Sequence, residues 1–134
     1  MGLLSGKRPA DLGVRDGRLK PPPSSPNCVS SQATGGYHAI APLAYRGSAG
    51  AAMKALADLV RASARTRIVT QTTDYLYAEY ESALLGFVDD VEFWFPPGTK
   101  VIHVRSASRL GYSDLGANRA RIEDIRTRLA ATGV

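Results

Sequence analysis

The stretch from Asp89 to Arg121 holds the side chains of this sequence that are best suited to chemistry. It reads DDVEFWFPPGTKVIHVRSASRLGYSDLGANRAR and combines acids, one histidine and four arginines with short apolar runs. Burying an unpaired charge costs several kcal/mol. The charged groups must therefore lie on an exposed face or pair with one another, and either arrangement predicts a polar cluster.

A divalent cation is one candidate ligand of this cluster, because hard cations favour carboxylate oxygens. Asp89, Asp90 and Glu92 supply carboxylates, and His103 follows on the expected partner strand. Successive residues of a strand point to opposite faces, so Asp89 and Asp90 share one ion only if a bulge re-aims one of them. We therefore favour ion pairing with nearby arginines, and we expect neither a metal nor a cofactor.

An anionic ligand is a second candidate. Arg105 and Arg109 flank Ser106 and Ser108, and a helix that begins near Asp114 would add free backbone amides. The carboxylate of Asp114 competes for the same amides. The simpler interpretation is that the arginines fix this loop onto acids of the sheet.

Nucleophilic catalysis is a third candidate. Cys28 is the single cysteine, and thiol chemistry would need His38 or His103 as the base, with Asp90 or Glu92 to orient that base. Nothing in the spacing brings these residues together. A lone cysteine in an arm is more often a small packing residue, which is the interpretation that we favour.

Two further groups of residues could shape a site. We expect Asn27, Cys28, Ser30 and Ser31 to dock the N-terminal arm onto the sheet through local hydrogen bonds and packing. Aromatic residues between the acids could instead line a groove for a ligand or peptide, since each ring buries area and keeps one polar atom wet. These residues are Tyr75, Tyr77, Tyr80 and Trp94.

The elements that must position these side chains are a helix, four strands and a second helix. The 134 residues fit one domain, with an N-terminal arm at residues 1–36, which are rich in proline, serine and glycine, and a single α+β domain at residues 37–134. Ser48 caps a helix that runs to about Ala64, and Ser113 or Asp114 begins a helix that runs to about Ala131. Strands are expected at 67–72, 74–81, 88–95 and 100–107.

These elements predict a two-layer α+β sandwich, in which a four-stranded antiparallel meander carries both helices on one face. A four-residue loop at 96–99 sets the register of the second hairpin, and it pairs Phe93 with Ile102, Glu92 with His103 and Asp90 with Arg105. The face without helices is expected to be partly open. Its side chains are Tyr75, Tyr77, Glu79, Asp90, Glu92, Trp94, His103 and Arg105.

Composition narrows the partners and the compartment. The net charge of +5 is divided between the arm and the last helix and is interrupted by acids, so nucleic-acid binding is not expected. No apolar window is long enough to cross a membrane. A single cysteine cannot form an internal disulfide and permits a reducing compartment, so we expect a cytoplasmic protein. We expect a small anionic ligand or a protein partner, while the oligomeric state stays open.

Three ordered motifs resemble a known family. PSSPNCVSSQ, YLYAEYESALLGFVDDVEF and VIHVRSASRLGYSDLGANRARIEDIR are similar to the family called domain of unknown function 1499, over nearly the whole chain from Asp11 onward. The resemblance implies a small domain of bacteria and, in longer forms, of plastids, without an established activity. The family often has a cysteine before the proline and serine run, where this chain has Pro22 and Pro23, so no pairing of two arm cysteines is expected. The polar positions that the resemblance implies are Ser25, Asn27, Cys28, Ser30, Ser31, Glu79, Ser82, Asp89, Asp90, Glu92, Arg105, Ser106, Ser108, Arg109, Asp114, Asn118 and Arg119.

We therefore expect a non-catalytic binding or accessory domain, whose polar site on the open sheet face accepts a small anionic ligand, a lipid headgroup or a protein partner. Two alternatives stay open: a small hydrolase or transferase that uses the acids or Cys28, and a polar cluster that is purely structural. The candidate ligand-binding residues are Tyr77, Glu79, Asp90, Glu92, His103, Arg105, Ser106, Ser108 and Arg109.

Overall fold

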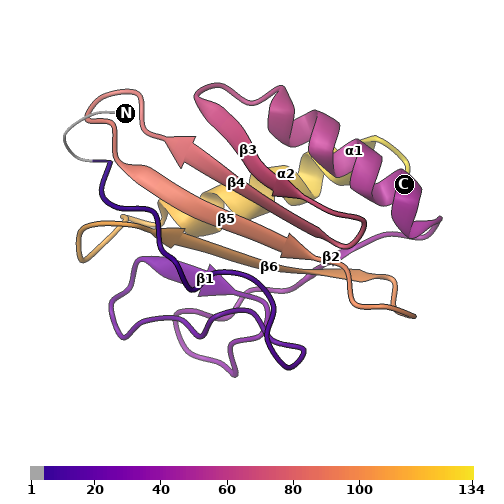
Figure 1. Cartoon of the computed structure of the whole chain (residues 1–134), viewed down its shortest axis with the longest axis horizontal. Helices are drawn as coiled ribbons and strands as arrows, with labels where there is room; N and C mark the ends of the chain where they lie inside the picture. The colour runs from indigo at the N-terminus through magenta and orange to yellow at the C-terminus, as the bar shows by residue number, and fades with distance from the viewer. Residues whose placement is uncertain (1–4) are drawn as a thin grey trace.

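A mostly antiparallel sheet forms the centre of the fold in the computed structural model, which describes residues 5–134 (Figure 1). Within these residues the sheet has six strands, in the order β1-β6-β5-β4-β3, and β2 pairs separately with β6. The α+β class is thus confirmed, but the expected four-stranded sheet is wrong. The two additional strands, of three and two residues, are too short to produce a periodic pattern. The strands are β1 Cys28–Ser30, β2 Leu43–Ala44, β3 Thr66–Gln71, β4 Tyr75–Glu81, β5 Val88–Trp94 and β6 Val101–Ser108.

Both helices pack on one face of this sheet. Helix α1 spans Ala49–Arg61, and Ser48 caps it by accepting a hydrogen bond from the amide of Ala51, as expected. Helix α2 spans Ala117–Ala131. The helices share one core with the inward residues of the central strands, so this face is fully apolar at its centre. The core residues at its centre include Met53, Leu56, Val60, Leu76, Val91, Phe93, Ile102, Val104, Ile122, Ile125 and Leu129.

Helix α2 begins later than the expected start near Asp114. Leu115 and Gly116 have positive φ angles of 54° and 83°, so the helix cannot begin before Ala117. The carboxylate of Asp114 still caps this end, because it accepts hydrogen bonds from the amides of Gly116 and Asn118. None of the helices in the described part of the chain is both long and apolar enough to cross a membrane.

The register of β5 against β6 differs by two residues from the expected one. Trp94 pairs with His103 and Glu92 with Arg105, instead of Trp94 with Val101 and Glu92 with His103. The prolines at 96 and 97 have no amide hydrogen to extend the ladder. The first residues of β6 pair with β2 instead. A shift of two residues keeps every side chain on its predicted face, so the membership of both faces was predicted correctly.

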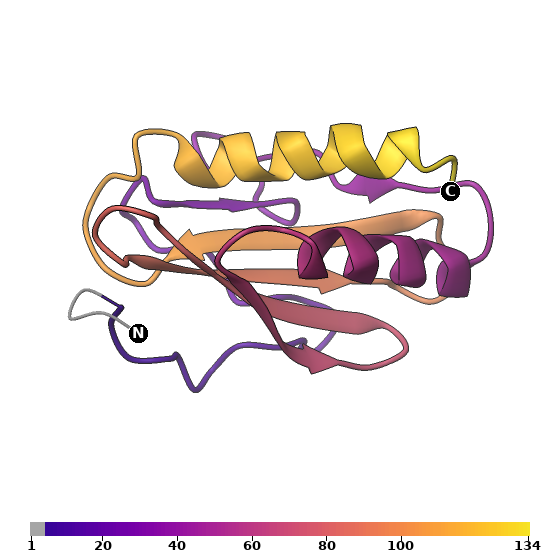
Figure 2. The ribbon, with the colours of Figure 1, turned by 90° about the horizontal axis from the view of Figure 1, so that it is seen from above.

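The N-terminal arm covers the sheet face that the sequence predicted to be partly open. The backbone of the arm approaches this face at Gly13 and Lys20, and its side chain at Arg8 reaches Glu79. Figure 2 shows the arm and α2 on opposite sides of the sheet. The open face is therefore a correction, and its cause is tertiary, because the arm supplies hydrogen-bond partners to side chains far away in the sequence.

Candidate functional site

The first polar cluster under the arm joins Asp90 and Glu79 through Arg109. The guanidinium of Arg109 donates to both carboxylate oxygens of Asp90, at 2.6 and 3.1 Å, and to Glu79 Oε2 at 2.8 Å. Tyr77 donates its hydroxyl proton to Asp90 Oδ1 at 2.5 Å. The side chains of Asp90, Glu79 and Arg109 are each at most 5% exposed. The cluster is therefore buried, and its charges satisfy one another.

The pKa values in this cluster reflect its cations. Burial alone would raise the pKa of Glu79, but hydrogen bonds from Arg8, Arg67 and Arg109 outweigh that effect and lower the pKa to about 2. Burial and the hydrogen bond to Asp90 both raise the pKa of the Tyr77 hydroxyl. Glu79 is therefore an anion and Tyr77 a hydrogen-bond donor at neutral pH, and neither is poised to exchange a proton.

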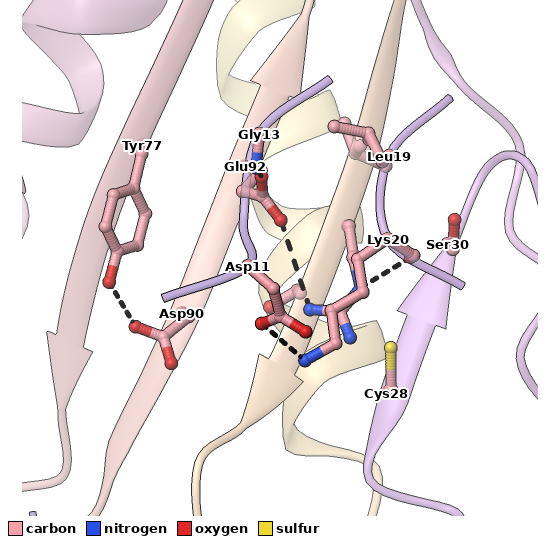
Figure 3. A network of polar contacts seen from close by, with 12 residues as sticks. Asp11, Gly13, Leu19, Lys20, Cys28, Ser30, Tyr77, Asp90 and Glu92 are labelled. Carbon is pink, nitrogen blue, oxygen red and sulfur yellow. Dashed lines mark hydrogen bonds and ion pairs between the residues drawn. The ribbon is translucent and has the colours of Figure 1, made fainter. Parts of the chain in front are cut away.

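The second cluster clamps the arm through Glu92. Glu92 Oε2 accepts hydrogen bonds from the hydroxyl of Tyr75 at 2.6 Å and from the amide of Gly13 at 2.7 Å. Arg105 donates through Nε to the carbonyl oxygen of Lys20 at 2.9 Å, while its Nη1 lies 4.0 Å from Glu92 Oε1. Figure 3 shows Gly13 and Lys20 of the arm against this part of the sheet. Two arm positions are thus held by two side chains of neighbouring strands.

Glu92 is fully buried, and its Oε1 atom has no hydrogen-bond partner among the described residues. Burial raises the pKa of its carboxyl, and the hydrogen bonds from Tyr75 and Gly13 and the charge of Arg105 offset that effect only in part. The pKa of Glu92 is therefore raised while the pKa of Glu79 is lowered, although both carboxyls lie on the same face of the sheet.

Ser106 and Ser108 do not join these clusters, because they lie on the helix side of β6. Ser106 donates to Asn118 Oδ1 at 2.7 Å, and Ser108 accepts from Asn118 Nδ2 at 3.0 Å. Asp89 lies on this side too and pairs with Arg121 at 2.7 Å. The expected anion site of arginines and serines is therefore split between the two faces of the sheet, since alternate residues of a strand point in opposite directions.

His103 is on the arm side but does not face Glu92. It stacks on Trp94 with 6.0 Å between ring centroids, and its Nδ1 lies 2.9 Å from the hydroxyl of Ser31. Burial lowers the pKa of His103, and the positive charge of Arg18 adds to this effect. His103 is therefore a neutral packing residue at neutral pH.

Cys28 and its neighbours fasten β1 to β6. Cys28, Val29 and Ser30 pair with Ala107, Ser106 and Arg105. The thiol of Cys28 is fully buried, and burial raises its pKa. Asn27 donates to the carbonyl oxygen of Gly111, and Ser31 donates to that of Val104. All four arm-docking residues thus contact the body of the domain.

Among the described residues, neither candidate base forms a hydrogen bond with the thiol, whose partner is the carbonyl oxygen of Val29 at 3.7 Å. His38 Nδ1 lies 2.8 Å from the carbonyl oxygen of Cys28, not from its sulfur. Across residues 5–134, no group of three or more histidine, cysteine, aspartate or glutamate side chains has the arrangement to hold a metal ion. The acids of the sheet face are engaged by arginines and tyrosines instead.

A pocket of about 290 Å³ lies between the arm and the loop that follows β1. We call it the arm pocket. Arg18 and Lys20 line it from the arm, and Ser30, Gln32 and His38 line it from β1 and the loop. None of the described residues that line it is acidic. One signal in the sequence points to this place, namely the three basic residues Arg15, Arg18 and Lys20. Sequence reasoning did not identify Arg18, Gln32 or His38 as ligand-binding residues.

Hydrogen bonds hold the walls of the arm pocket in place. Gln32 accepts from the amide of Leu19 at 2.7 Å and donates to the carbonyl oxygen of Gly17 at 3.0 Å. Arg18 donates to the carbonyl oxygen of Gln32 at 3.1 Å. Lys20 forms an ion pair with Asp11 at 2.9 Å, outside the pocket lining. Hydrogen bonds thus connect the two walls of the pocket, and Arg18 is the cation of its lining that has no acidic partner among the described residues.

Comparisons with known proteins agree with the motifs. No curated protein matches this chain. A family model matches residues 18–129, which include β1, the lining of the arm pocket and the strand side chains of both buried clusters, but neither Arg8 nor Gly13. This match covers most of the chain and confirms the resemblance found in the sequence. The chain therefore belongs to the family described as "Protein of unknown function (DUF1499)".

Proposed function

We propose that this chain is a non-catalytic binding domain that recognises a small anionic group in the arm pocket. The observation that carries the proposal is the lining of that pocket, in which two cationic side chains, a histidine and polar groups meet without an acid among the described residues. A volume of about 290 Å³ suits a phosphate or a small carboxylic acid. Cationic donors make the strongest hydrogen bonds to such groups.

The pocket offers hydrogen-bonding atoms with defined positions. His38 donates through Nδ1 to the carbonyl oxygen of Cys28, which fixes the Nδ1–H tautomer and leaves Nε2 to accept a hydrogen bond from a protonated oxygen of the ligand. One Nη atom of Arg18 is used by Gln32, so the rest of its guanidinium fork is available. Arg18 lines the arm pocket from the arm and His38 lines it from the loop after β1. A singly protonated phosphate group would accept a hydrogen bond from Arg18 and donate one to His38.

In this proposal the two buried clusters support the site and do not contact the ligand. Tyr77, Glu79, Asp90 and Arg109 satisfy one another, and Glu92 and Arg105 hold the backbone of the arm next to the pocket. The sequence predicted that the side chains of these clusters bind the ligand themselves. The present proposal keeps the binding function, but it gives the clusters the structural role that was the alternative. The catalytic alternative has less support, because the thiol of Cys28 is buried and has a raised pKa.

Isothermal titration calorimetry of the full chain tests the proposal. The probes are inorganic phosphate, a phosphomonoester and small mono- and dicarboxylic acids, each at low salt. We expect saturable binding of at least one probe and a loss of tenfold or more in affinity for Arg18→Ala, because a hydrogen bond to a charged group contributes about 1.5–3 kcal/mol.

Arg46→Ala is the matched control, because it removes the same charge from an exposed residue outside the arm pocket. Arg46 lies between β2 and α1. Equal affinities for the two variants would show that the anion responds to net charge alone. Absence of saturable binding for every probe would also refute the proposal.

A further inference from the structure

Two loops at one end of the sheet carry exposed apolar side chains. Leu84 is 88% exposed and Leu115 is 95% exposed. Single exposed apolar residues are common on folded proteins, whereas a group at one place marks an interaction surface. We call this group the apolar end. It comprises Leu84 and Leu85 in the loop between β4 and β5, and Leu110, Tyr112 and Leu115 in the loop between β6 and α2.

The two loops are neighbours because of the strand directions. β4 and β6 both run antiparallel to β5, so the C-terminal ends of β4 and β6 lie at the same end of the sheet. Figures 1 and 2 show the two loops at the same end of the molecule. A hollow of about 280 Å³ lies between them, lined by Ser82 and Phe87 from one loop and by Leu110 and Leu115 from the other. Leu110 and Leu115 therefore rim this hollow, and Leu84 and Leu85 belong to the loop that supplies its other side.

The exposed charge around the apolar end is positive. Lys7 is exposed and follows Gly6, where an added Cβ would lie 2.9 Å from Leu110 Cγ. Arg8 is partly exposed, but its guanidinium is already paired with Glu79 at 2.7 Å. Arg65 is exposed and exchanges backbone and side-chain hydrogen bonds with Glu81, just before the first loop. Lysine and arginine near an anionic lipid surface each contribute to attraction.

The acidic side chains in the strands and loops of the apolar end are buried or half-buried. Glu79, Asp89 and Asp90 are buried and paired with arginines. Asp114 is half-buried and caps α2, and Glu81 is half-buried too. Within residues 5–134, Lys7 and Arg65 are exposed cations at this end. The exposed acids that line a hollow with Arg65 are Asp58 and Asp124, and each is paired with a basic residue of its own helix.

We propose that the apolar end docks on an anionic lipid bilayer. The leucine tips would enter the boundary between headgroups and acyl chains, and the exposed cations would lie at the level of the lipid phosphates. A second copy of the chain fits this end less well, because self-association would bring two positive surfaces together. This surface is separate from the arm pocket, and neither proposal depends on the other.

Vesicle flotation of the full chain tests the docking. Vesicles of phosphatidylcholine alone are compared with vesicles that also contain phosphatidylglycerol. We expect binding to the anionic vesicles, and a decrease on the order of tenfold or more for the double variant Leu84→Ser and Leu115→Ser. Both side chains are almost fully exposed, so the double variant should keep its fold, which circular dichroism verifies.

A charge pair provides the matched control. Lys7→Ala, at the apolar end, should weaken binding by about fivefold, whereas Arg46→Ala, at the opposite end, should leave it unchanged. Equal effects of the two variants would show attraction by net charge without a defined orientation, and this would overturn the proposal.

Fluorescence quenching by brominated lipids tests the orientation. Trp94 is the single tryptophan and lies at the opposite end of β5. The indole introduced by Tyr112→Trp should be quenched on brominated anionic vesicles, while Trp94 in the unchanged protein should not. Absence of vesicle binding, binding that survives the double leucine variant, quenching of Trp94, or a dimer that the leucine variant abolishes would each overturn the proposal.

Discussion

Replacement of Arg109 by methionine should destabilise the domain by about 4 kcal/mol. Arg109 makes three hydrogen bonds to two buried carboxylates, at 2.6, 2.8 and 3.1 Å. Methionine fills a similar volume but leaves Asp90 with the hydroxyl of Tyr77 as its remaining hydrogen-bond donor from a side chain. Removing one member of a buried ion pair costs about 3–5 kcal/mol, because the other charge is stranded.

Arg67→Met is the matched control for this effect. Arg67 also donates to Glu79, at 2.8 Å, but its side chain is 63% exposed, so water replaces it at a cost of at most about 1 kcal/mol. Urea denaturation at neutral pH, followed by circular dichroism, gives the free energy of unfolding of both variants.

A double-mutant cycle then isolates the pair. Asp90→Asn removes the stranded charge, so the variant with both Arg109→Met and Asp90→Asn should be less destabilised than the sum of the two single variants. Equal losses for Arg109→Met and Arg67→Met, or strict additivity in the cycle, would refute the description of Arg109 and Asp90 as a buried, mutually satisfied pair.

Three further predictions concern protons and the thiol. Glu79 has its pKa lowered from 4.5 to about 2, so its ion pairs stabilise the fold above about pH 4.5 and this contribution disappears as the pH falls toward 2. Urea titrations should therefore show that Glu79→Gln has a free energy of unfolding about 2 kcal/mol below that of the parent at pH 6, and that the difference shrinks on acidification. A difference that does not change with pH would contradict this. Glu92 has a raised pKa, so its contribution to the free energy of unfolding is greatest below its unfolded pKa and decreases as the pH rises through its folded pKa. The stability of Glu92→Gln relative to the parent should therefore increase from acid toward neutral pH. A decrease over this range would be inconsistent with the raised pKa. Cys28 is fully buried, so native protein should resist alkylation by iodoacetamide at neutral pH and react on unfolding, whereas fast native alkylation would point to an accessible thiolate.

The sequence predicted the faces of the sheet because those depend on local alternation. Tyr77, Glu79, Asp90 and Glu92 share one face as their spacing indicated, and Ser48 caps α1 as its position indicated. The hairpin register was less accessible. It depends on Pro96 and Pro97 and on the pairing of β6 with β2, which is only two residues long.

The arm and the arm pocket were beyond prediction for a different reason. The amide of Gly13 donates to Glu92, which is 79 positions away in the sequence. The local sequence of the arm contains no pattern that predicts such a long-range contact. β1 is a strand only because Cys28 to Ser30 pair with the last residues of β6. Arg18 and His38 meet at the arm pocket for the same reason, so the residues proposed to bind an anion became visible only in the fold.

Hydrogen exchange at the amide of Gly13 tests the central claim most directly, namely that the arm is a fixed part of the domain. This amide donates to Glu92 Oε2 at 2.7 Å. Nuclear magnetic resonance should show it exchanging at least a hundredfold more slowly than an unstructured glycine, and Glu92→Ala should remove most of that protection. Exchange at the unstructured rate in the unchanged protein would contradict the account, because the polar face would then be open to solvent.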